Sequence, residues 1–567
     1  MVSIAAVIPL VVVLGVITGL RRPAPWAAGA GVGAAVLLIG WRPEFALPRD
    51  ALGTGAAGAG LLVLNAAAVM LPGVYLSQVL TRRGVHESLQ EWVRALPLSG
   101  PAKVALVVAG IAPMVEALTG FGVSLLVTVP VLLALAPPAT ALRQAMLGMN
   151  IMPWGTLGLA TVIGATLTDL PLPTLGTATA ITSALVFPLV TVWAALLARP
   201  DHRLRTTVQA AGAGGLLALA LLVCNHLGAV SPAGVLAGLV TTAVGLLLCA
   251  ARRASGAART AAVSTEATVE GTQGGHGVRP SGESASRDVE VHRTFPRGTA
   301  AGRAGNDGAV RFAQGGSGSR VVRGGTGSGV RSGDVRFWVG GRSQRVGRLV
   351  PPATVLYAYG LVLVGIAMLR AATAVGVPPG VLHAGGASFA LLASPGLPLL
   401  MAALVLDRRR PRWAEARAAL GRVGRPLLAL TGFVVLGRLM VDSGMIDRLG
   451  AAVSTAPPLV IVLAAPALGM LAGFVTGSNV GGNALMLPLQ QQLAPAGLDT
   501  WFAAVQNSGA GHAVFTSLPM IMLVLAVAGD RASGAGVSEN TLLRFGLRVA
   551  LAIYAALAAV LVTISLL

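Results

Sequence analysis

Long apolar stretches recur along most of the chain, and they restrict its fold more than any other feature of the sequence. The stretches before residue 251 are 4–20, 26–40, 55–80, 102–119, 123–136, 141–165, 174–198, 207–225 and 231–250. Those after Pro351 are 352–370, 384–405, 423–441, 457–475, 484–494, 501–528 and 545–567. Because a helix needs roughly 20 apolar residues to cross a bilayer, the sequence predicts an all-α polytopic membrane protein. We expect about 12–16 hydrophobic segments, with some helices broken or re-entrant because Gly and Pro interrupt them.

The composition excludes several other classes of protein. Only 11% of the 567 residues are charged, whereas soluble proteins average about 25%. This excludes a soluble globular enzyme, a disordered protein and a coiled coil. The two cysteines, Cys224 and Cys249, lack the spacing of a metal site or a disulfide framework. The sequence also lacks HExxH, GxSxG and Walker A motifs, so we expect no metal, no cofactor and no catalytic residue.

A segment of different composition separates two apolar blocks. From 251 to 350 the chain is rich in Arg, Gly and Ser, and it cannot bury enough apolar surface to fold alone. We predict a first transmembrane half at 1–250, a disordered cytoplasmic linker at 251–350 and a second transmembrane half at 351–567. The linker is either a regulatory or lipid-contacting tether or a tolerated insertion. The second reading is favoured because long disordered insertions cost little free energy.

The net charge of +20 has two competing explanations. In a soluble protein, 41 Lys and Arg against 21 Asp and Glu would indicate nucleic-acid binding. In a membrane protein, cationic loops stay on the cytoplasmic side. Arg-rich loops fall between the apolar stretches, for example at Arg21–Arg22, Arg199–Arg205 and Asp407–Arg412. Placing them inside predicts an outward N-terminus, an odd number of crossings before the linker and a second half of inverted topology. We therefore expect a multi-pass protein of the cell inner (cytoplasmic) membrane with no nucleic-acid partner.

Two polar, Gly-rich motifs interrupt the apolar pattern. The first is Met114–Gly122, followed by Asn150–Gly155, and the second is Gly473–Asn483, followed by Gln506–His512. Backbone that leaves a helix inside a bilayer must line a cavity or be buried in protein. Broken helices at corresponding positions of two halves are typical of transporter binding sites.

The spacing within the two motifs is the same. Asn150 follows Gly120 by 30 residues, and Asn507 follows Gly477 by 30 residues. A broken helix exposes N–H groups at one half-helix end, where they and the helix dipole favour an anion. The alternative is that the glycines only pack helices and the amides only bond neighbouring helices. The equal spacing in both halves favours a binding site.

The candidate substrate-binding residues are the Gly, hydroxyl and amide residues of the motifs, together with one arginine. They are Thr119, Gly120, Gly122, Asn150, Thr476, Gly477, Ser478, Asn479, Asn483, Gln506, Asn507 and Arg438. Amide side chains can bond a hydroxyl and a carboxylate together, and a guanidinium can hold a carboxylate through two hydrogen bonds. Alternatively, Arg438 forms an ion pair with Asp442 or Glu116, or extends to the membrane interface.

Two further residues are candidates for proton coupling. Glu116 lies in an apolar stretch beside the first Gly-rich break, and an intramembrane acid is a functional hypothesis by default because its burial is costly. The alternative is a structural partner of the helix break. His512 follows the second motif and could relay a proton, although a lone His is more often a hydrogen-bonded structural residue.

The two motifs resemble those of the bacterial L-lactate permease family. Glu116–Gly122 is similar to that family's Glu-Gly-x-x-Gly-Phe-Gly segment, and Phe474–Leu485 is similar to its Phe-x-Thr-Gly-Ser-(Asn/Asp)-x-x-x-Asn-Ala-Leu segment. Gly511–Met520 keeps a Pro but lacks the family's Lys and Ser-Pro-Gln. The resemblance implies uptake of L-lactate, and often glycolate, with protons through the cytoplasmic membrane.

Three other functions are compatible with parts of the sequence. One is a transporter or antiporter for another small carboxylate or ion, and the second is an integral-membrane enzyme, which would need acids or histidines clustered at one membrane face. The third is a channel, whose uptake would not depend on a proton gradient. The expected partners are a small carboxylate, protons and the lipid bilayer, and homo-oligomerisation is left open.

Overall fold

The computed structural model describes residues 2–120, 122–270, 351–407, 413–453 and 455–567. Before residue 271 the helices are α1 (Val2–Leu14), η1 (Gly15–Gly19), α2 (Ala24–Trp41), η2 (Pro43–Phe45), α3 (Arg49–Arg82), α4 (Val85–Ala95), α5 (Gly100–Leu106), η3 (Val107–Ile111), α6 (Ala112–Thr119), α7 (Ser124–Leu133), α8 (Pro138–Leu147), η4 (Thr156–Gly158), α9 (Leu159–Thr168), α10 (Leu172–Ser183), α11 (Val186–Leu196), α12 (Arg203–His226) and α13 (Ala233–Glu270). Helix α13 extends past residue 251, where we expected the linker to begin, and the rest of the predicted linker lies outside the described residues.

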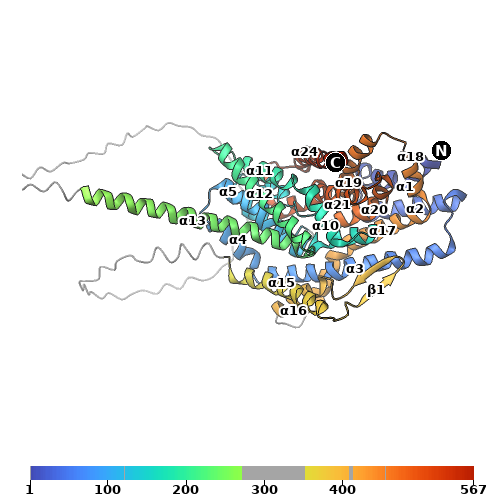
Figure 1. The fold of residues 1–567 in the computed structure, drawn as a ribbon, viewed down its shortest axis with the longest axis horizontal. Coiled ribbons are helices and arrows are strands. Elements are labelled where there is room, and N and C mark those ends of the chain that lie inside the picture. The colour runs from blue at the N-terminus through green and yellow to red at the C-terminus, as the bar shows by residue number, and fades with distance from the viewer. Residues whose placement is uncertain (1, 121, 271–350, 408–412, 454) are drawn as a thin grey trace, which may run out of the picture. The chain divides into compact units, whose positions relative to one another are not determined.

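The second apolar block is also almost entirely helical (Figure 1). Its elements are α15 (Ala353–Ala374), β1 (Val381–Ala384), β2 (Ala387–Ala390), α16 (Gly396–Asp407), α17 (Trp413–Asp442), α18 (Met445–Val453), α19 (Pro458–Thr476), α20 (Asn479–Leu493), α21 (Asp499–Ala513), η5 (Val514–Thr516), α22 (Leu518–Ala528), α23 (Asp530–Gly534) and α24 (Glu539–Leu566). The strands form an antiparallel hairpin, with Val381 opposite Ala390, that packs on α3. This hairpin takes up the start of the apolar stretch 384–405, which we expected to be helical, because Gly385–Gly386 forms a tight turn there.

The described residues include 9 helices that are long and apolar enough to cross a membrane, or up to 11 if each of two bent helix pairs counts as one span. The bent pairs are α10 with α11, and α21 with α22, each bent by 42°. Shorter apolar helices at Ile4–Gly19, Ser124–Leu133, Thr156–Thr168 and Gly396–Asp407 complete the set. The prediction of an all-helical, multi-pass membrane protein with broken helices is therefore confirmed.

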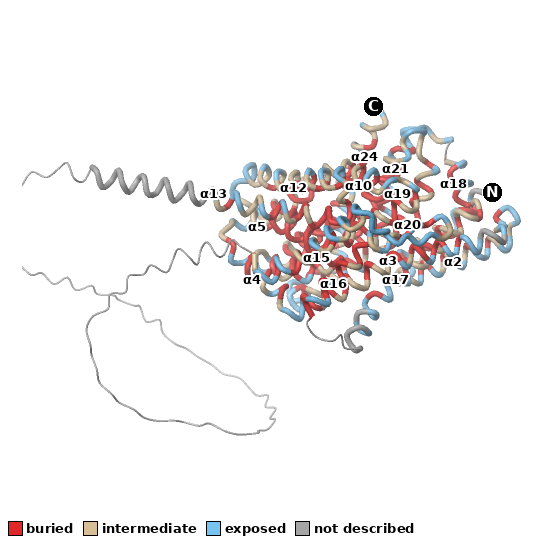
Figure 2. The backbone as a smooth tube through the Cα atoms, turned by 60° about the horizontal axis from the view of Figure 1, so that its bottom comes forward, coloured by how far each residue is buried: buried red, intermediate tan, exposed pale blue. Residues whose placement is uncertain are grey.

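The outer helices present large apolar side chains on their outward faces. Trp26, Leu37, Leu204, Met368 and Leu551 are each more than two-thirds exposed. Such a surface is unfavourable in water and favourable in lipid. Buried residues concentrate in the middle of the helical body, where helices from both halves of the chain meet (Figure 2).

The order of elements in the first half repeats in the second. A long helix (α3 or α17) is followed by a short amphipathic helix (α4 or α18), and a glycine with positive φ separates the two, with φ of 65° at Gly84 and 71° at Gly444. Next comes a membrane-length apolar segment, formed by α5, η3 and α6 in the first half and by α19 in the second. Each such segment ends at one of the two predicted breaks. The structure thus places the two polar motifs at the same point of each series, while the opposite orientation of the halves across a membrane stays a prediction.

In each half, the helix that follows the break packs against a helix of the opposite half. Helix α7, which follows the first break, packs against α22 of the second half, and α20, which follows the second break, packs against α9 of the first half. In Figure 1, α10, α20 and α21 lie together in the centre of the helical body, and α10 and α20 each contact α21. Each broken helix is therefore held by the opposite half of the chain.

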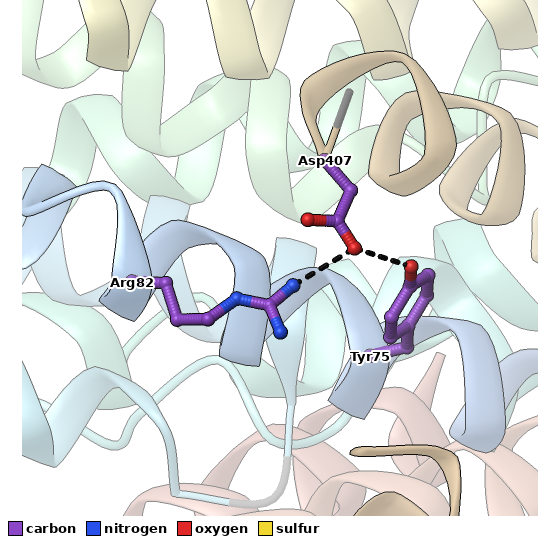
Figure 3. Close-up of polar contacts among 3 residues, drawn as sticks. All are labelled: Tyr75, Arg82 and Asp407. Atoms are coloured by element: carbon purple, nitrogen blue, oxygen red, sulfur yellow. Dashed lines mark hydrogen bonds and ion pairs between the residues drawn. The ribbon is translucent and has the colours of Figure 1, made fainter. Parts of the chain in front are cut away.

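A charged cluster joins α3 to α16. One carboxylate oxygen of Asp407, Oδ2, accepts a hydrogen bond from the Tyr75 hydroxyl at 2.7 Å and pairs with the Arg82 guanidinium at 2.9 Å (Figure 3). The Asp407 side chain is only 7% exposed, whereas that of Arg82 is 36% exposed. The cluster therefore links the two halves at the border between a buried and an accessible region.

Candidate functional site

The first break is held by Glu116. Helix α6 ends at Thr119, and Gly120 follows with φ 70° and ψ −173°, a conformation open to glycine but costly for other residues. The fully buried Glu116 carboxylate accepts hydrogen bonds from the Gly122 N–H at 2.9 Å, the Ser124 N–H at 3.2 Å and the Ser124 hydroxyl at 2.6 Å. The carboxyl group thus lies at the N-terminal end of α7, where the helix dipole favours its ionised form. These contacts accord with the alternative to proton coupling, in which Glu116 is a structural partner of the helix break.

The second break uses a different cap. Gly477 has φ 63°, and the Ser478 hydroxyl accepts a hydrogen bond from the Gly481 N–H at 3.3 Å, which caps α20. The Thr476 hydroxyl lies 2.8 Å from the Ala472 carbonyl and 2.7 Å from that of Ser478. Thr119 makes the matching bond at the first break, from its hydroxyl to the Val115 carbonyl at 2.7 Å. In both halves a threonine therefore satisfies a carbonyl of the last helical turn before the break.

A buried network of amides and hydroxyls lies next to the second break, with Asn507 at its centre. Its Oδ1 accepts hydrogen bonds from Asn483 Nδ2 at 2.8 Å and Asn479 Nδ2 at 3.0 Å. Its Nδ2 donates to the Thr179 hydroxyl at 3.1 Å and the Thr161 hydroxyl at 3.3 Å. The network thus joins α20 and α21 of the second half to α9 and α10 of the first.

The network also bonds the backbone after α8, where the chain is not helical. Asn479 Nδ2 lies 3.1 Å from the Met152 carbonyl and 3.0 Å from the Pro153 carbonyl. Asn483 Nδ2 lies 3.3 Å from the Ala160 carbonyl, which belongs to the first turn of α9. By contrast, Oδ1 of Asn479 and Oδ1 of Asn483 are buried and have no hydrogen-bond partner among the described residues. A buried acceptor without a donor is costly, so these two oxygens are the atoms of the network best suited to receive a donor from a ligand or water.

A second amide pair continues the network along α19, α20 and α21. Gln490 Nε2 donates to the Ala465 carbonyl at 2.7 Å and to Gln506 Oε1 at 3.2 Å. Gln506 Nε2 donates to the Gly482 carbonyl at 3.2 Å. Gln506, a predicted site residue, therefore bonds the helix that also carries Asn479 and Asn483.

Several hydroxyl groups that face the amide network were not predicted from the sequence. Thr161 and Thr179 bond Asn507, and the Ser508 hydroxyl lies 2.6 Å from that of Thr182 and 3.0 Å from that of Ser183. The polar run Thr177–Ser183, inside an otherwise apolar stretch, was the signal that could have identified Thr179, Thr182 and Ser183.

Besides the break residues Thr119, Gly120, Gly122, Thr476, Gly477 and Ser478, four predicted site residues lie outside the network. Asn150 Nδ2 donates to the Val108 carbonyl at 3.1 Å, in the π-helical turn η3. The buried ring of His512 meets the Phe187 ring edge-on at 5.6 Å, and its Nε2 has no partner in the described part of the chain. Glu116 bonds its own break, and Arg438 pairs with Asp442 at 3.1 Å, one of the two ion pairs we considered.

Arg438 nevertheless lies near α20. It lines a small cavity of about 180 Å³ together with Ala484, Pro488 and Gln491 of that helix. Gly437 packs directly on the Ala484 carbonyl, one residue after Asn483. The guanidinium is therefore next to the helix that carries the network, with no hydrogen bond to the network itself among the described residues.

Helix α22 connects the two breaks. A Cβ placed on Gly122 would lie 3.2 Å from Met520 Sδ, and one on Gly477 would lie 3.4 Å from the Ser517 hydroxyl and 3.4 Å from the Pro519 ring. Met520 and Pro519 belong to the first turn of α22, and Ser517 immediately precedes it. A movement of α22 would therefore change the surroundings of both breaks together.

A comparison with known protein families finds a match in the second half of the chain. Residues 364–567 match the family model described as L-lactate permease, a range that includes the second break and Asn479, Asn483 and Asn507. No curated protein matches the chain. The family suggests a membrane transporter of small molecules rather than an enzyme. The resemblance predicted from the second motif is thus confirmed, and residues 364–567 of this multi-pass membrane protein match the L-lactate permease family.

Proposed function

We propose that the protein is a secondary active transporter that takes up L-lactate, or a related small 2-hydroxy monocarboxylate such as glycolate, with protons across the cytoplasmic membrane. The observation that carries the proposal is the buried amide network at the second break, which joins broken segments from both halves. Binding sites of secondary transporters are built in this way, from discontinuous helices at the interface of two repeats.

The chemistry of the network suits a ligand with both a hydroxyl and a carboxylate. The unpartnered Oδ1 atoms of Asn479 and Asn483 can accept a hydrogen bond from the hydroxyl. The carboxylate needs donors and positive potential, which the first turn of α20 provides through its N–H groups and dipole. Arg438, at the small cavity on the same helix, is a second donor for an arriving carboxylate.

Glu116 is our first candidate for the coupled proton. Its carboxylate accepts three hydrogen bonds across the first break. Protonation would remove the charge that strengthens these bonds, and it would weaken the attachment of α7 to the end of α6. Because α7 packs on α22, which also contacts the second break, a proton at Glu116 could bias the substrate site. His512 is the second candidate, since its Nε2 is buried without a partner in the described residues.

The test is uptake of labelled substrates into proteoliposomes, with and without an imposed pH gradient. We expect L-lactate and glycolate to accumulate against a concentration gradient only when the lumen is alkaline. Pyruvate, which lacks the hydroxyl donor, should compete poorly. Asn479→Ala should abolish uptake. Gln144→Ala should retain it, because within the described part of the chain this buried amide bonds the Ala194 carbonyl alone, at 3.0 Å.

The same experiment separates the rival functions. Uptake of lactate that ignores the pH gradient would indicate a channel, and accumulation of a different carboxylate or ion would indicate a transporter of other specificity. Absence of all transport in correctly folded protein would refute the proposal.

A further inference from the structure

A large cavity in the first half of the chain lies away from the amide network. It has a volume of about 880 Å³ and is bounded by α5, α12, α13 and the turn between α11 and α12. None of the network residues lines it. The residues around it fall into two groups, a charged mouth and a mostly apolar interior, so the cavity needs an explanation of its own.

The mouth of the cavity is cationic. Arg199, His202 and Arg205 line it from the exposed turn before α12 and its first helical turn. Asp201 is the one acidic residue in this lining, as far as the chain is described. Helix α12 begins at Arg203 and has no side-chain cap, so its dipole adds positive potential at the same place. An anion is therefore favoured at the mouth.

The remainder of the lining is mostly apolar, with polar exceptions such as Thr206, Gln209 and Thr241, and it extends along α12. Its walls include Leu106 of α5, Leu216 of α12, and Val244 and Leu248 of α13. From Arg205 to Leu216 the helix rises roughly 16 Å, at about 1.5 Å per residue. One leaflet contributes about half of a hydrocarbon core that is about 30 Å thick. The length of the apolar wall therefore matches the depth of a single leaflet.

We propose that this cavity binds an anionic phospholipid, with the phosphate at Arg199 and Arg205 and the acyl chains along α12. Guanidinium groups bind phosphate through two hydrogen bonds, and basic pockets between membrane helices on the cytoplasmic side bind anionic headgroups. The Arg-rich turn at 199–205 is one that we place on that side. The proposal does not depend on the identity of the transported substrate.

The experiment measures lipid binding to the purified full-length protein. Dioleoyl phosphatidylglycerol and dioleoyl phosphatidylcholine are added separately, because they share acyl chains and differ in headgroup charge. We expect phosphatidylglycerol to raise the thermal unfolding midpoint and phosphatidylcholine to leave it nearly unchanged. The double variant Arg199→Gln with Arg205→Gln should weaken apparent phosphatidylglycerol affinity roughly tenfold or more. Arg203→Gln is the matched control, since Arg203 is exposed in the same turn but does not line the cavity.

Two further measurements test the proposal independently of the double variant. Leu216→Trp fills the apolar end and leaves every charge in place, so it should reduce the effect of phosphatidylglycerol even if the double variant does not fold. Soluble glycerol 3-phosphate should not raise the midpoint, because it has no acyl chains to bury. An equal response to the neutral lipid, an equal response to glycerol 3-phosphate, or unchanged lipid affinity in Leu216→Trp would overturn the proposal.

Discussion

Asn507 and Asn150 occupy the same position in the two sequence motifs, yet replacing each with Ala should have very different consequences. Asn507 takes part in four side-chain hydrogen bonds, whereas Asn150 donates one, to a backbone carbonyl. Hydrogen bonds between membrane helices contribute about 0.6 kcal/mol on average and about 1.7 kcal/mol at most. Asn507→Ala should therefore lower the free energy of unfolding by roughly 2–4 kcal/mol, and Asn150→Ala by roughly 0.6–1 kcal/mol.

The assay is reversible unfolding of each variant in mixed micelles, with L-lactate uptake measured in parallel. Asn507→Ala should lose uptake, because Asn479 and Asn483 lose the acceptor that orients their amides. Losses of stability that are equal in the two variants would refute the reasoning, since they would show that the motif position alone, and not the number of bonds, determines the cost.

Three further perturbations follow from separate parts of the structure. Glu116→Gln should reach the membrane but lose pH-driven uptake, because the neutral amide cannot release and recapture a proton; normal pH-dependent uptake in that variant would contradict the proposed coupling. Asp407→Asn should lower the free energy of unfolding by about 1 kcal/mol, because it breaks the ion pair with Arg82 and leaves a neutral oxygen for the Tyr75 hydroxyl; unchanged unfolding in micelles would show that the cluster adds nothing. Burial lowers the pKa of His86 below its ordinary value of 6.5, with Glu87 opposing this shift, so the unfolded chain binds the proton more readily and stability should fall as the pH drops below about 6.5; His86→Gln should flatten that part of the pH–stability curve.

The sequence predicted the general architecture well because bilayers impose strict rules on composition. Apolar stretches and two equally spaced Gly-rich motifs were enough to predict a helical membrane protein with broken helices. The exact partners of the motif residues were not predictable, since they depend on which backbone groups lose their helical bonds. Asn150 bonds Val108 because a π-helical turn lies beside it, and no residue pattern in the motif signals that turn.

Hydroxyl residues were the main omission at the candidate site. Thr161 lies in a stretch whose hydropathy is that of an ordinary membrane span, so composition alone does not separate it from the many threonines that bond their own helix. Thr182 is of both kinds, since its hydroxyl bonds its own helix and also lies 2.6 Å from that of Ser508. Only the three-dimensional arrangement shows which threonines face the second half.

The contacts exchanged between the halves have a consequence for biosynthesis. Helix α7 packs on α22, which is translated roughly 385 residues later. At about 5–20 residues per second, the ribosome needs roughly 20–80 s to cover that distance. During this interval the first break lacks its contact with α22. The Glu116 carboxyl group and the backbone groups that have no helical hydrogen bond then lie in the nascent membrane segment. Insertion of the first half therefore has to be followed by a waiting period, in which a chaperone, the insertion machinery or provisional contacts hold that segment until the second half arrives.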